Sequence, residues 1–229
     1  MIMKGGFTQD QIAVIGETEQ LLHEARYDPQ FAEMMRARGY NEESWAHGES
    51  LLNDAKAAGR AKEQAESTKL GATNTYERQR EEMWQFSSAL AQTCTVLFQG
   101  RTEWLNALGL HARRKDGNGT SQIARPNKSA KLDLMVTWQR NLFDMAQNTP
   151  EIAASLANNG YPVDMLAQGA SGVEALVQAN HRQEQAKATA MQRRKERDMA
   201  FKALIQWLRC AQRAAEFVRQ DAEGSLLGR

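Results

Sequence analysis

Residues 28–40, DPQFAEMMRARGY, return in altered form as residues 149–161, TPEIAASLANNGY, and this recurrence decides the fold. Each stretch places Asp or Thr before a proline and ends in Gly-Tyr. Asp and Thr side chains cap helix N-termini, and proline is favoured at the first helical position. Glycine readily takes the left-handed conformation that closes a helix. We therefore predict a short helix in each stretch, ended by Gly39 and by Gly160.

The two stretches belong to a longer duplication with a constant offset of 121 residues, as from Gly39 to Gly160. The same offset pairs Gly48 with Gly169, and it aligns residues 63–65 with residues 184–186, which are Glu-Gln-Ala in both copies. Self-similarity at a fixed offset indicates tandem copies of one structural unit. We assign repeat one to residues 8–108 and repeat two to residues 129–225, joined by a linker over residues 109–128.

A first helix precedes each short helix. Thr8 and Gln11 have the spacing of a capping box ahead of an apolar run, and Ser129 stands at the equivalent position of repeat two. We therefore expect one helix to start after Thr8 and another after Ser129.

A long segment with few helix breakers follows each short helix. It runs from Asn41 to about Leu108 in repeat one and from Pro162 to about Glu223 in repeat two. The sequence leaves open whether each long helix is continuous, kinked or split, near Gly71 in one copy and Arg193 in the other. The continuous or kinked form is favoured, because Arg193 and its neighbours contain no turn residue and duplicated units should fold alike.

These elements predict an all-α fold. The chain has 229 residues, only 4 prolines and abundant helix-favouring residues. Neither repeat obviously encloses a core alone, so we expect one helical-bundle domain over residues 1–229, with the repeats related by a pseudo-two-fold axis. No apolar run is long enough to span a membrane, and no secretory signal is recognised at the start. We expect a cytoplasmic protein with two reduced cysteines.

Few residues suggest chemistry. Glu19 with His23, and Glu43 with a second histidine, have helical spacing that could supply metal ligands. The repeat offset relates His23 to Asp144 and Glu43 to Asp164. At the positions equivalent to Glu19 and to the second histidine, the sequence has no typical metal ligand. His23, Glu43, Asp144 and Asp164 are therefore the only candidates for a site between the repeats, and neither a cofactor nor a catalytic residue is predicted.

Basic residues cluster in two places. The first set lies in or beside the linker and the second lies in repeat two: His111, Arg113, Arg114, Lys115, Arg125, Lys128 and Lys131, then Arg193, Arg194, Lys195 and Arg197. The linker contains no aromatic residue for base stacking, and acidic residues interrupt the second set. With a net charge of +1, solvated charge is the favoured interpretation, and nucleic acid is not an expected partner.

The repeated pattern is similar to that of an uncharacterised bacterial family of duplicated all-helical hypothetical proteins. The resemblance rests on the proline, the Gly-Tyr pair, the alanine two positions before Gly48 or Gly169, and the Glu-Gln-Ala triplet. It implies a helical fold and a bacterial origin, and it transfers no biochemistry because these are capping and packing motifs.

The sequence favours a non-enzymatic interaction or assembly scaffold. Long Ala-rich helices and an internal duplication suit association with a protein partner, or self-association, through helices. The alternative is a small-ligand or metal-binding bundle with its site between the repeats.

Overall fold

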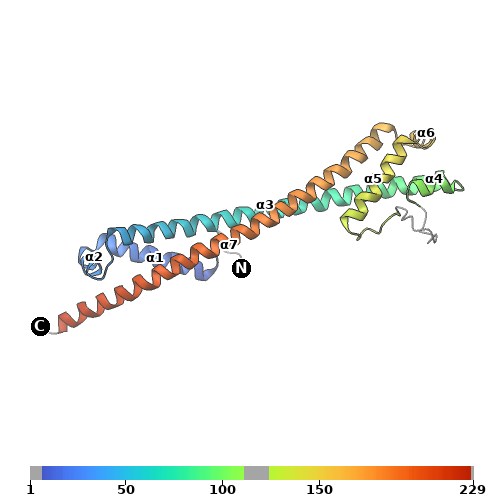
Figure 1. Ribbon diagram of the computed structural model, residues 1–229. Coiled ribbons are helices and arrows are strands. Elements are labelled where there is room, and N and C mark those ends of the chain that lie inside the picture. Colours follow the sequence, from blue (N-terminus) through green and yellow to red (C-terminus); the bar gives the residue numbers. More distant parts are fainter. Residues whose placement is uncertain (1–6, 111–123, 228–229) are drawn as a thin grey trace. The chain divides into compact units, whose positions relative to one another are not determined.

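The computed structural model describes residues 7–110 and 124–227, and within these ranges the chain forms seven helices and no strand (Figure 1). In chain order they are α1 (Gln9–Tyr27), α2 (Pro29–Arg36), α3 (Glu42–Leu97), α4 (Thr102–Ala107), α5 (Leu132–Asn148), α6 (Pro150–Ala157) and α7 (Val163–Leu227). The predicted all-α class is confirmed.

Both long helices are continuous. Helix α3 has 56 residues and α7 has 65, and neither Gly71 nor Arg193 interrupts them. A Cβ atom added at Gly71 would meet nothing within 4 Å, so this glycine serves no close approach. The expected end of the first long segment near Leu108 is wrong, because Gly100 takes a φ of 89° and turns the chain from α3 into α4.

The two first helices begin differently. Thr8 caps α1 as predicted: its hydroxyl accepts from the Gln11 N–H at 3.3 Å, and the Gln11 side chain accepts from the Thr8 N–H at 3.0 Å. The Ser129 prediction is wrong. Helix α5 begins at Leu132 without a side-chain cap, and the Ser129 hydroxyl donates to the Asn127 side chain at 3.1 Å instead.

The short helices α2 and α6 confirm the predicted stops. Gly39 and Gly160 have φ values of 92° and 87°, in the region that favours glycine. The N–H of each following tyrosine donates back across the last turn, from Tyr40 to the Met35 carbonyl and from Tyr161 to that of Leu156, at 3.0 Å each. These are Schellman closures.

The helices form two compact units, each built from chain segments that are far apart in sequence. Unit 1 comprises Met1–Lys69 and Ala186–Arg229, and unit 2 comprises Leu70–Gln185. The late part of α7 therefore packs with α1, α2 and the early part of α3. The late part of α3 packs with α4, α5, α6 and the early part of α7. The single domain over residues 1–229 stays a prediction.

Unit 1 has a core of two adjoining apolar clusters that join these segments. Helices α1 to α3 supply Leu21, Phe31, Met35, Leu52 and Ala55, and α7 supplies Phe201, Leu204, Leu208, Ala211, Ala215 and Val218. All of them are buried. Burial of apolar surface against the late part of α7 is therefore what closes this unit.

Unit 2 has a larger, single cluster, in which 18 buried residues from α3 to α7 take part. Its bulkiest members are on α5, where Trp138, Leu142 and Phe143 are each 0% exposed. Helix α4 adds Leu105, and the residue after its end, Leu108, is also fully buried. A short helix thus covers the core of unit 2 at the end of α3.

Glycines allow close helix contact within each unit. A Cβ atom at Gly48 on α3 would collide with the Trp207 ring of α7. One at Gly169 on α7 would collide with the rings of Phe143 and Phe86. The ring of a partly or fully buried aromatic residue thus occupies the place that a side chain would need.

We predict that Gly169→Ala destabilises the protein by about 1–3 kcal/mol, because the added methyl overpacks the core against two rings. Gly71→Ala is the matched control within a long helix. It should stabilise by up to about 1 kcal/mol, because alanine favours helix and the site is open. Urea unfolding followed by circular dichroism measures both; equal effects of the two variants would contradict the close packing at Gly169.

A second prediction concerns the caps of the short helices. The Asp28 carboxylate accepts from the N–H groups of Gln30 and Phe31 at 3.0 Å each, whereas the Thr149 side chain makes no capping bond. Asp28→Ala should therefore cost about 1 kcal/mol of unfolding free energy, and Thr149→Ala clearly less. Chemical denaturation of the two variants in parallel decides this, and an equal loss would show that the difference in capping has no energetic weight.

Candidate functional site

The four candidate ligands do not form a cluster. His23, Glu43, Asp144 and Asp164 are all exposed; the first two belong to unit 1 and the last two to unit 2. The His23 ring contacts Tyr27, with 4.5 Å between ring centroids, and Asp144 accepts from the Asn148 amide at 2.7 Å. In the described part of the chain, no group of three or more His, Cys, Asp or Glu side chains could hold a metal ion.

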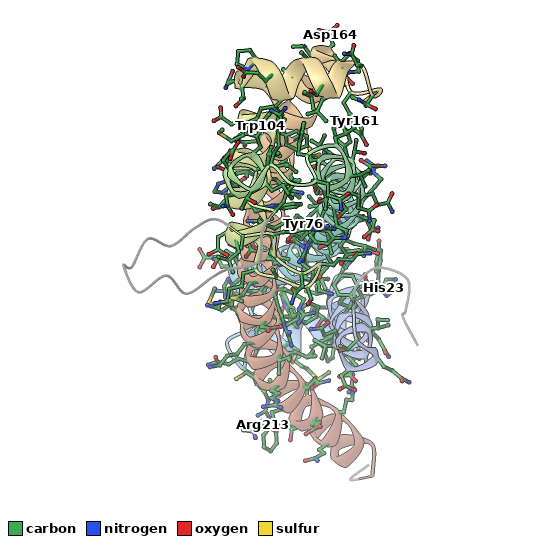
Figure 2. All side chains as sticks on the ribbon, turned by 90° about the vertical axis from the view of Figure 1, so that its right-hand side faces the viewer. His23, Tyr76, Trp104, Tyr161, Asp164 and Arg213 are labelled. Atoms are coloured by element: carbon green, nitrogen blue, oxygen red, sulfur yellow. The ribbon has the colours of Figure 1, made fainter. Side chains whose placement is uncertain are left out.

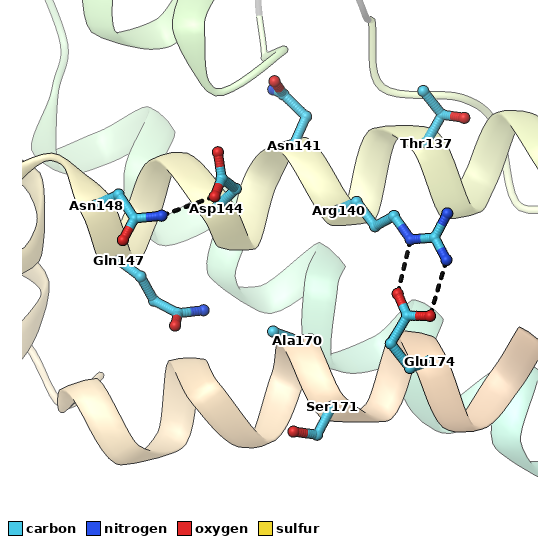
Figure 3. A pocket seen from close by; sticks show the side chains of 9 residues that line it. All are labelled: Thr137, Arg140, Asn141, Asp144, Gln147, Asn148, Ala170, Ser171 and Glu174. Carbon is cyan, nitrogen blue, oxygen red and sulfur yellow. Dashed lines mark hydrogen bonds and ion pairs between the residues drawn. The ribbon is translucent and has the colours of Figure 1, made fainter.

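Unit 2 contains an open furrow of about 700 Å³ between α5 and α7 (Figure 3). Its lining residues are almost all polar: Thr137, Arg140, Asn141, Asp144, Gln147 and Asn148 from α5, and Ala170, Ser171 and Glu174 from α7. Helical spacing of three and four residues places the α5 members on one face. Asp144 is the one predicted site residue that lines it.

Most of the furrow's polar side chains form hydrogen bonds, either with one another or with nearby backbone carbonyls. The Arg140 guanidinium donates to both oxygens of the Glu174 carboxylate, at 2.7 and 2.8 Å. This hydrogen-bonded pair lowers the pKa of the Glu174 carboxyl and raises that of Arg140. Asn141 and Gln147 donate to backbone carbonyls, those of Ala107 and Leu166.

The furrow has no arrangement typical of catalysis. Neither a histidine nor a cysteine is among its lining residues, and its two carboxylates already accept hydrogen bonds, Glu174 from Arg140 and Asp144 from Asn148. The Thr137 hydroxyl donates to the Asp133 carbonyl at 2.8 Å. Each ionic group faces a bonded partner and solvent. This geometry suits a solvated helix–helix boundary.

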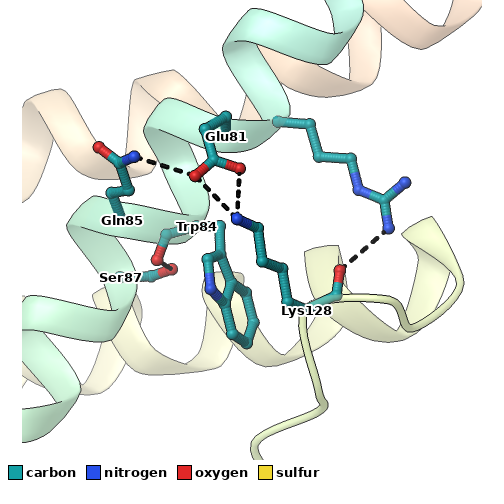
Figure 4. A network of polar contacts seen from close by, with 6 residues as sticks. Glu81, Trp84, Gln85, Ser87 and Lys128 are labelled. Carbon is teal, nitrogen blue, oxygen red and sulfur yellow. Dashed lines mark hydrogen bonds and ion pairs between the residues drawn. The ribbon is translucent and has the colours of Figure 1, made fainter.

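A second hollow in unit 2, of about 590 Å³, lies beside Trp84 and is crossed by a polar network (Figure 4). The Lys128 ammonium donates to the Glu81 carboxylate at 2.9 Å, which lowers the pKa of that carboxyl. Arg80 donates to the backbone carbonyls of Lys128 and Ala130, at 3.3 and 2.9 Å. These bonds tie the chain ahead of α5 to α3.

Arg125 is held by aromatic rings. Its guanidinium carbon lies 5.6 Å from the Trp84 ring centre and 5.8 Å from that of Trp138, within cation–π range. Arg125 and Lys128 therefore serve internal contacts. Of the other basic residues predicted in this region, Lys131 is exposed at the start of α5, and His111, Arg113, Arg114 and Lys115 lie outside the described residues.

The late part of α7 presents one face away from the core of unit 1. We call this the outer face of α7; its members are all exposed and follow helical spacing: Ala188, Met191, Gln192, Lys195, Asp198, Met199, Lys202, Gln206, Arg209, Cys210, Arg213, Glu216 and Phe217. Figure 2 labels Arg213 near its end. Met191 and Met199 are each 63% exposed, far more than a core methionine.

The outer face carries four cations without ion pairs among the described residues: Lys195, Lys202, Arg209 and Arg213. Its two carboxylates differ, because Asp198 accepts from the Arg197 guanidinium at 3.0 Å while Glu216 has no ion pair in the same ranges. Two other cations of the predicted second cluster are not available in this way. Arg193 forms an ion pair with Glu196, and Arg197 is only 9% exposed.

Sequence reasoning missed this division of the second basic cluster. It treated Arg193, Arg194, Lys195 and Arg197 as one solvated group, although Arg197 is buried, as are Phe201 and Leu204 further along α7. The missed signal is spacing: Arg197 lies seven residues before the buried Leu204, whereas Lys195 lies seven before the exposed Lys202.

The two cysteines should react very differently. Cys94 is buried in unit 2, and burial raises the pKa of its thiol to about 12, so the reactive thiolate is scarce below that pH. Cys210 is exposed on the outer face of α7. At pH 8 the native protein should take up one maleimide, and Cys210→Ser should abolish the uptake. Mass spectrometry would contradict this if Cys94 were labelled without denaturant.

In the ranges 7–110 and 124–227, no helix has both the length and the apolar character needed to cross a membrane. Comparison with known protein families, curated proteins and solved structures found no match to this chain. The resemblance to helical bacterial proteins therefore stays a prediction, and the function has to be argued from the surface.

Proposed function

We propose that this chain is a cytoplasmic, non-enzymatic helical scaffold that associates with another protein through its helices, chiefly through the outer face of α7. The exposure of Met191 and Met199 carries the proposal. They lie on one face of a continuous helix and are 63% exposed each. Apolar side chains gathered on one exposed helix face are typical of a helix-mediated contact.

The length of the exposed face supports the same function. From Ala188 to Phe217 it extends for about 44 Å, at 1.5 Å per residue. The opposite face of this segment is fixed in the core of unit 1 by Phe201, Leu204 and Leu208. A face held rigid in this way binds with a small loss of conformational entropy.

We also propose that the two tandem repeats form equivalent units by exchanging their long helices. Two matched contacts support this. Gly48 receives the Trp207 ring and Gly169 receives the Phe86 ring, and the offset of 121 residues converts one pair into the other. The Schellman closures at Gly39 and Gly160 match in the same way.

The alternative, a small-ligand or metal-binding bundle with a site between the repeats, has no such support. Its four candidate ligands are exposed, and His23 and Glu43 lie outside the lining of the furrow. The furrow itself is built from α5 and α7, both of repeat two, and its charged groups already bind each other.

Photo-crosslinking in the cells that make the protein tests the scaffold. A benzoylphenylalanine in place of Met199 should give a discrete crosslinked protein, because that position is exposed at the centre of the outer face of α7. The matched control places the same probe at Val96 on α3, which is 74% exposed and lies off this face. It should give no equivalent product.

The proposal fails if neither position crosslinks to protein, or if Val96 crosslinks to the same species as Met199. Mass spectrometry of the Met199 product distinguishes a different protein from a second copy of this chain. Native mass measurement of the purified chain gives its oligomeric state independently.

A further inference from the structure

We propose that the partner bound by the outer face of α7 is an acidic, amphipathic helix of a different protein, not a second copy of this chain. This inference rests on the proposed scaffold function and specifies its partner. It is carried by the cations of this face and their register.

The cations are aligned and available. Lys195, Lys202 and Arg209 recur every seven residues, and together with Arg213 they span about 27 Å of exposed helix. None of the four forms an ion pair with another described residue, in contrast to Arg26, Arg38 and Arg219, exposed cations of unit 1 that each pair with a carboxylate. A partner with carboxylates at matching intervals would neutralise them.

The register is that of a helix–helix seam. Lys195, Met199, Lys202, Gln206, Arg209 and Arg213 follow one another at intervals of four and three residues. This alternation keeps one line of side chains facing a second helix that crosses at a shallow angle. The partner helix would place apolar residues against the methionines and carboxylates against the lysines and arginines.

A second copy does not fit this surface. Two such faces packed together would oppose four cations with four cations, and like charges in contact are destabilising. The only uncommitted carboxylate on the face among described residues is Glu216, which cannot balance them.

The methionines favour a helix over a phosphate backbone or a lipid surface. Phosphate contacts use cations alone and leave Met191 and Met199 in water. Interfacial membrane helices bury a continuous apolar face with bulky residues, whereas this face alternates its methionines with lysine, arginine and glutamine. A groove-filling or side-by-side helix uses both kinds of side chain.

Binding assays with the full-length chain test the inference. The probe is a synthetic acidic amphipathic helix of about four heptads, with Leu on one face and Glu beside it, and its Glu→Lys version is the negative control. A DNA duplex and vesicles of phosphatidylserine with phosphatidylcholine are the competing arms. We expect the acidic helix to bind, and binding to weaken as salt rises from about 0.05 M to about 0.3 M.

Charge-matched variants locate the contact. Lys195→Glu with Lys202→Glu should weaken binding of the acidic helix about tenfold or more, because both substitutions oppose its carboxylates. Arg60→Glu with Arg182→Glu changes the net charge equally at two other exposed positions without ion pairs in the described ranges. This control should retain binding within about twofold, and circular dichroism should show equal helicity in both variants.

Three results would overturn the inference: no binding of the acidic helix, equal loss in both double variants, or tighter binding of duplex or vesicle than of the helix. If the Met199 crosslink to another protein persists while the acidic helix fails, the scaffold stands and the partner's chemistry is wrong. If the Met199 crosslink is absent as well, the scaffold itself fails.

Discussion

The ring of an aromatic residue lying over a helical glycine is the contact on which each unit depends. Trp207 occupies the space beside Gly48, and Phe86 and Phe143 occupy the space beside Gly169. Each ring brings a large apolar area into the core, and each glycine lets the helix that carries it come close. A side chain at either glycine would collide with these rings, so the rings or the helix would have to shift.

These contacts also join chain segments that are far apart in sequence. Gly48 lies early in α3 and contacts Trp207 late in α7, whereas Phe86 lies late in α3 and contacts Gly169 early in α7. Each unit thus combines the late part of one long helix with the early part of the other. Both long helices run uninterrupted through segments of the two units, and Gly71 lies in an open part of α3, where glycine costs about 1 kcal/mol relative to alanine.

Much of the local structure could be predicted from the sequence, because its causes lie within a few residues. The closures at Gly39 and Gly160 and the cap at Asp28 follow from side-chain and backbone chemistry in one turn. The same rule failed at Ser129, where a neighbouring asparagine competes for the hydroxyl. The packing of the late part of each long helix with the early part of the other could not be predicted, since an offset in the sequence does not say which segments meet.

The sequence indicated the basic cluster on α7, but its charge count did not separate the exposed members from the buried one. Lys195 and Arg197 stand two residues apart in one basic run, yet one is exposed on the outer face and the other is buried beside the core. A count of charges cannot separate them, whereas the heptad position relative to Leu204 does. The four ligand candidates form no cluster because the offset relates His23 to Asp144 by sequence position alone. Residues at equivalent positions of two segments need not lie near each other.

Two buried aromatic residues of unit 2 stand at positions where unit 1 has polar side chains. Phe98 and Trp138 are buried in the core cluster of unit 2, and the residues offset by 121 positions are Arg219 and Glu17 in unit 1. There the polar side chains bond across α1 and α7 instead, Arg219 to Glu24 and Gln212 to Glu17, at 2.7 and 2.9 Å. Polar side chains of α1 and α7 thus bond to each other in unit 1 at positions where unit 2 has buried aromatic residues.

The four cations of the outer face of α7 also have no basic counterparts on α3. The offset relates its four cations to uncharged or acidic residues on α3: Asn74, Glu81, Ser88 and Gln92. Exposed positions tolerate substitution, because little packing depends on them. Since α3 lacks the charge pattern of α7 at these positions, the pattern is not a requirement of helix packing. It gives each chain one basic helix face, and a partner that recognises it would bind in a ratio of one to one.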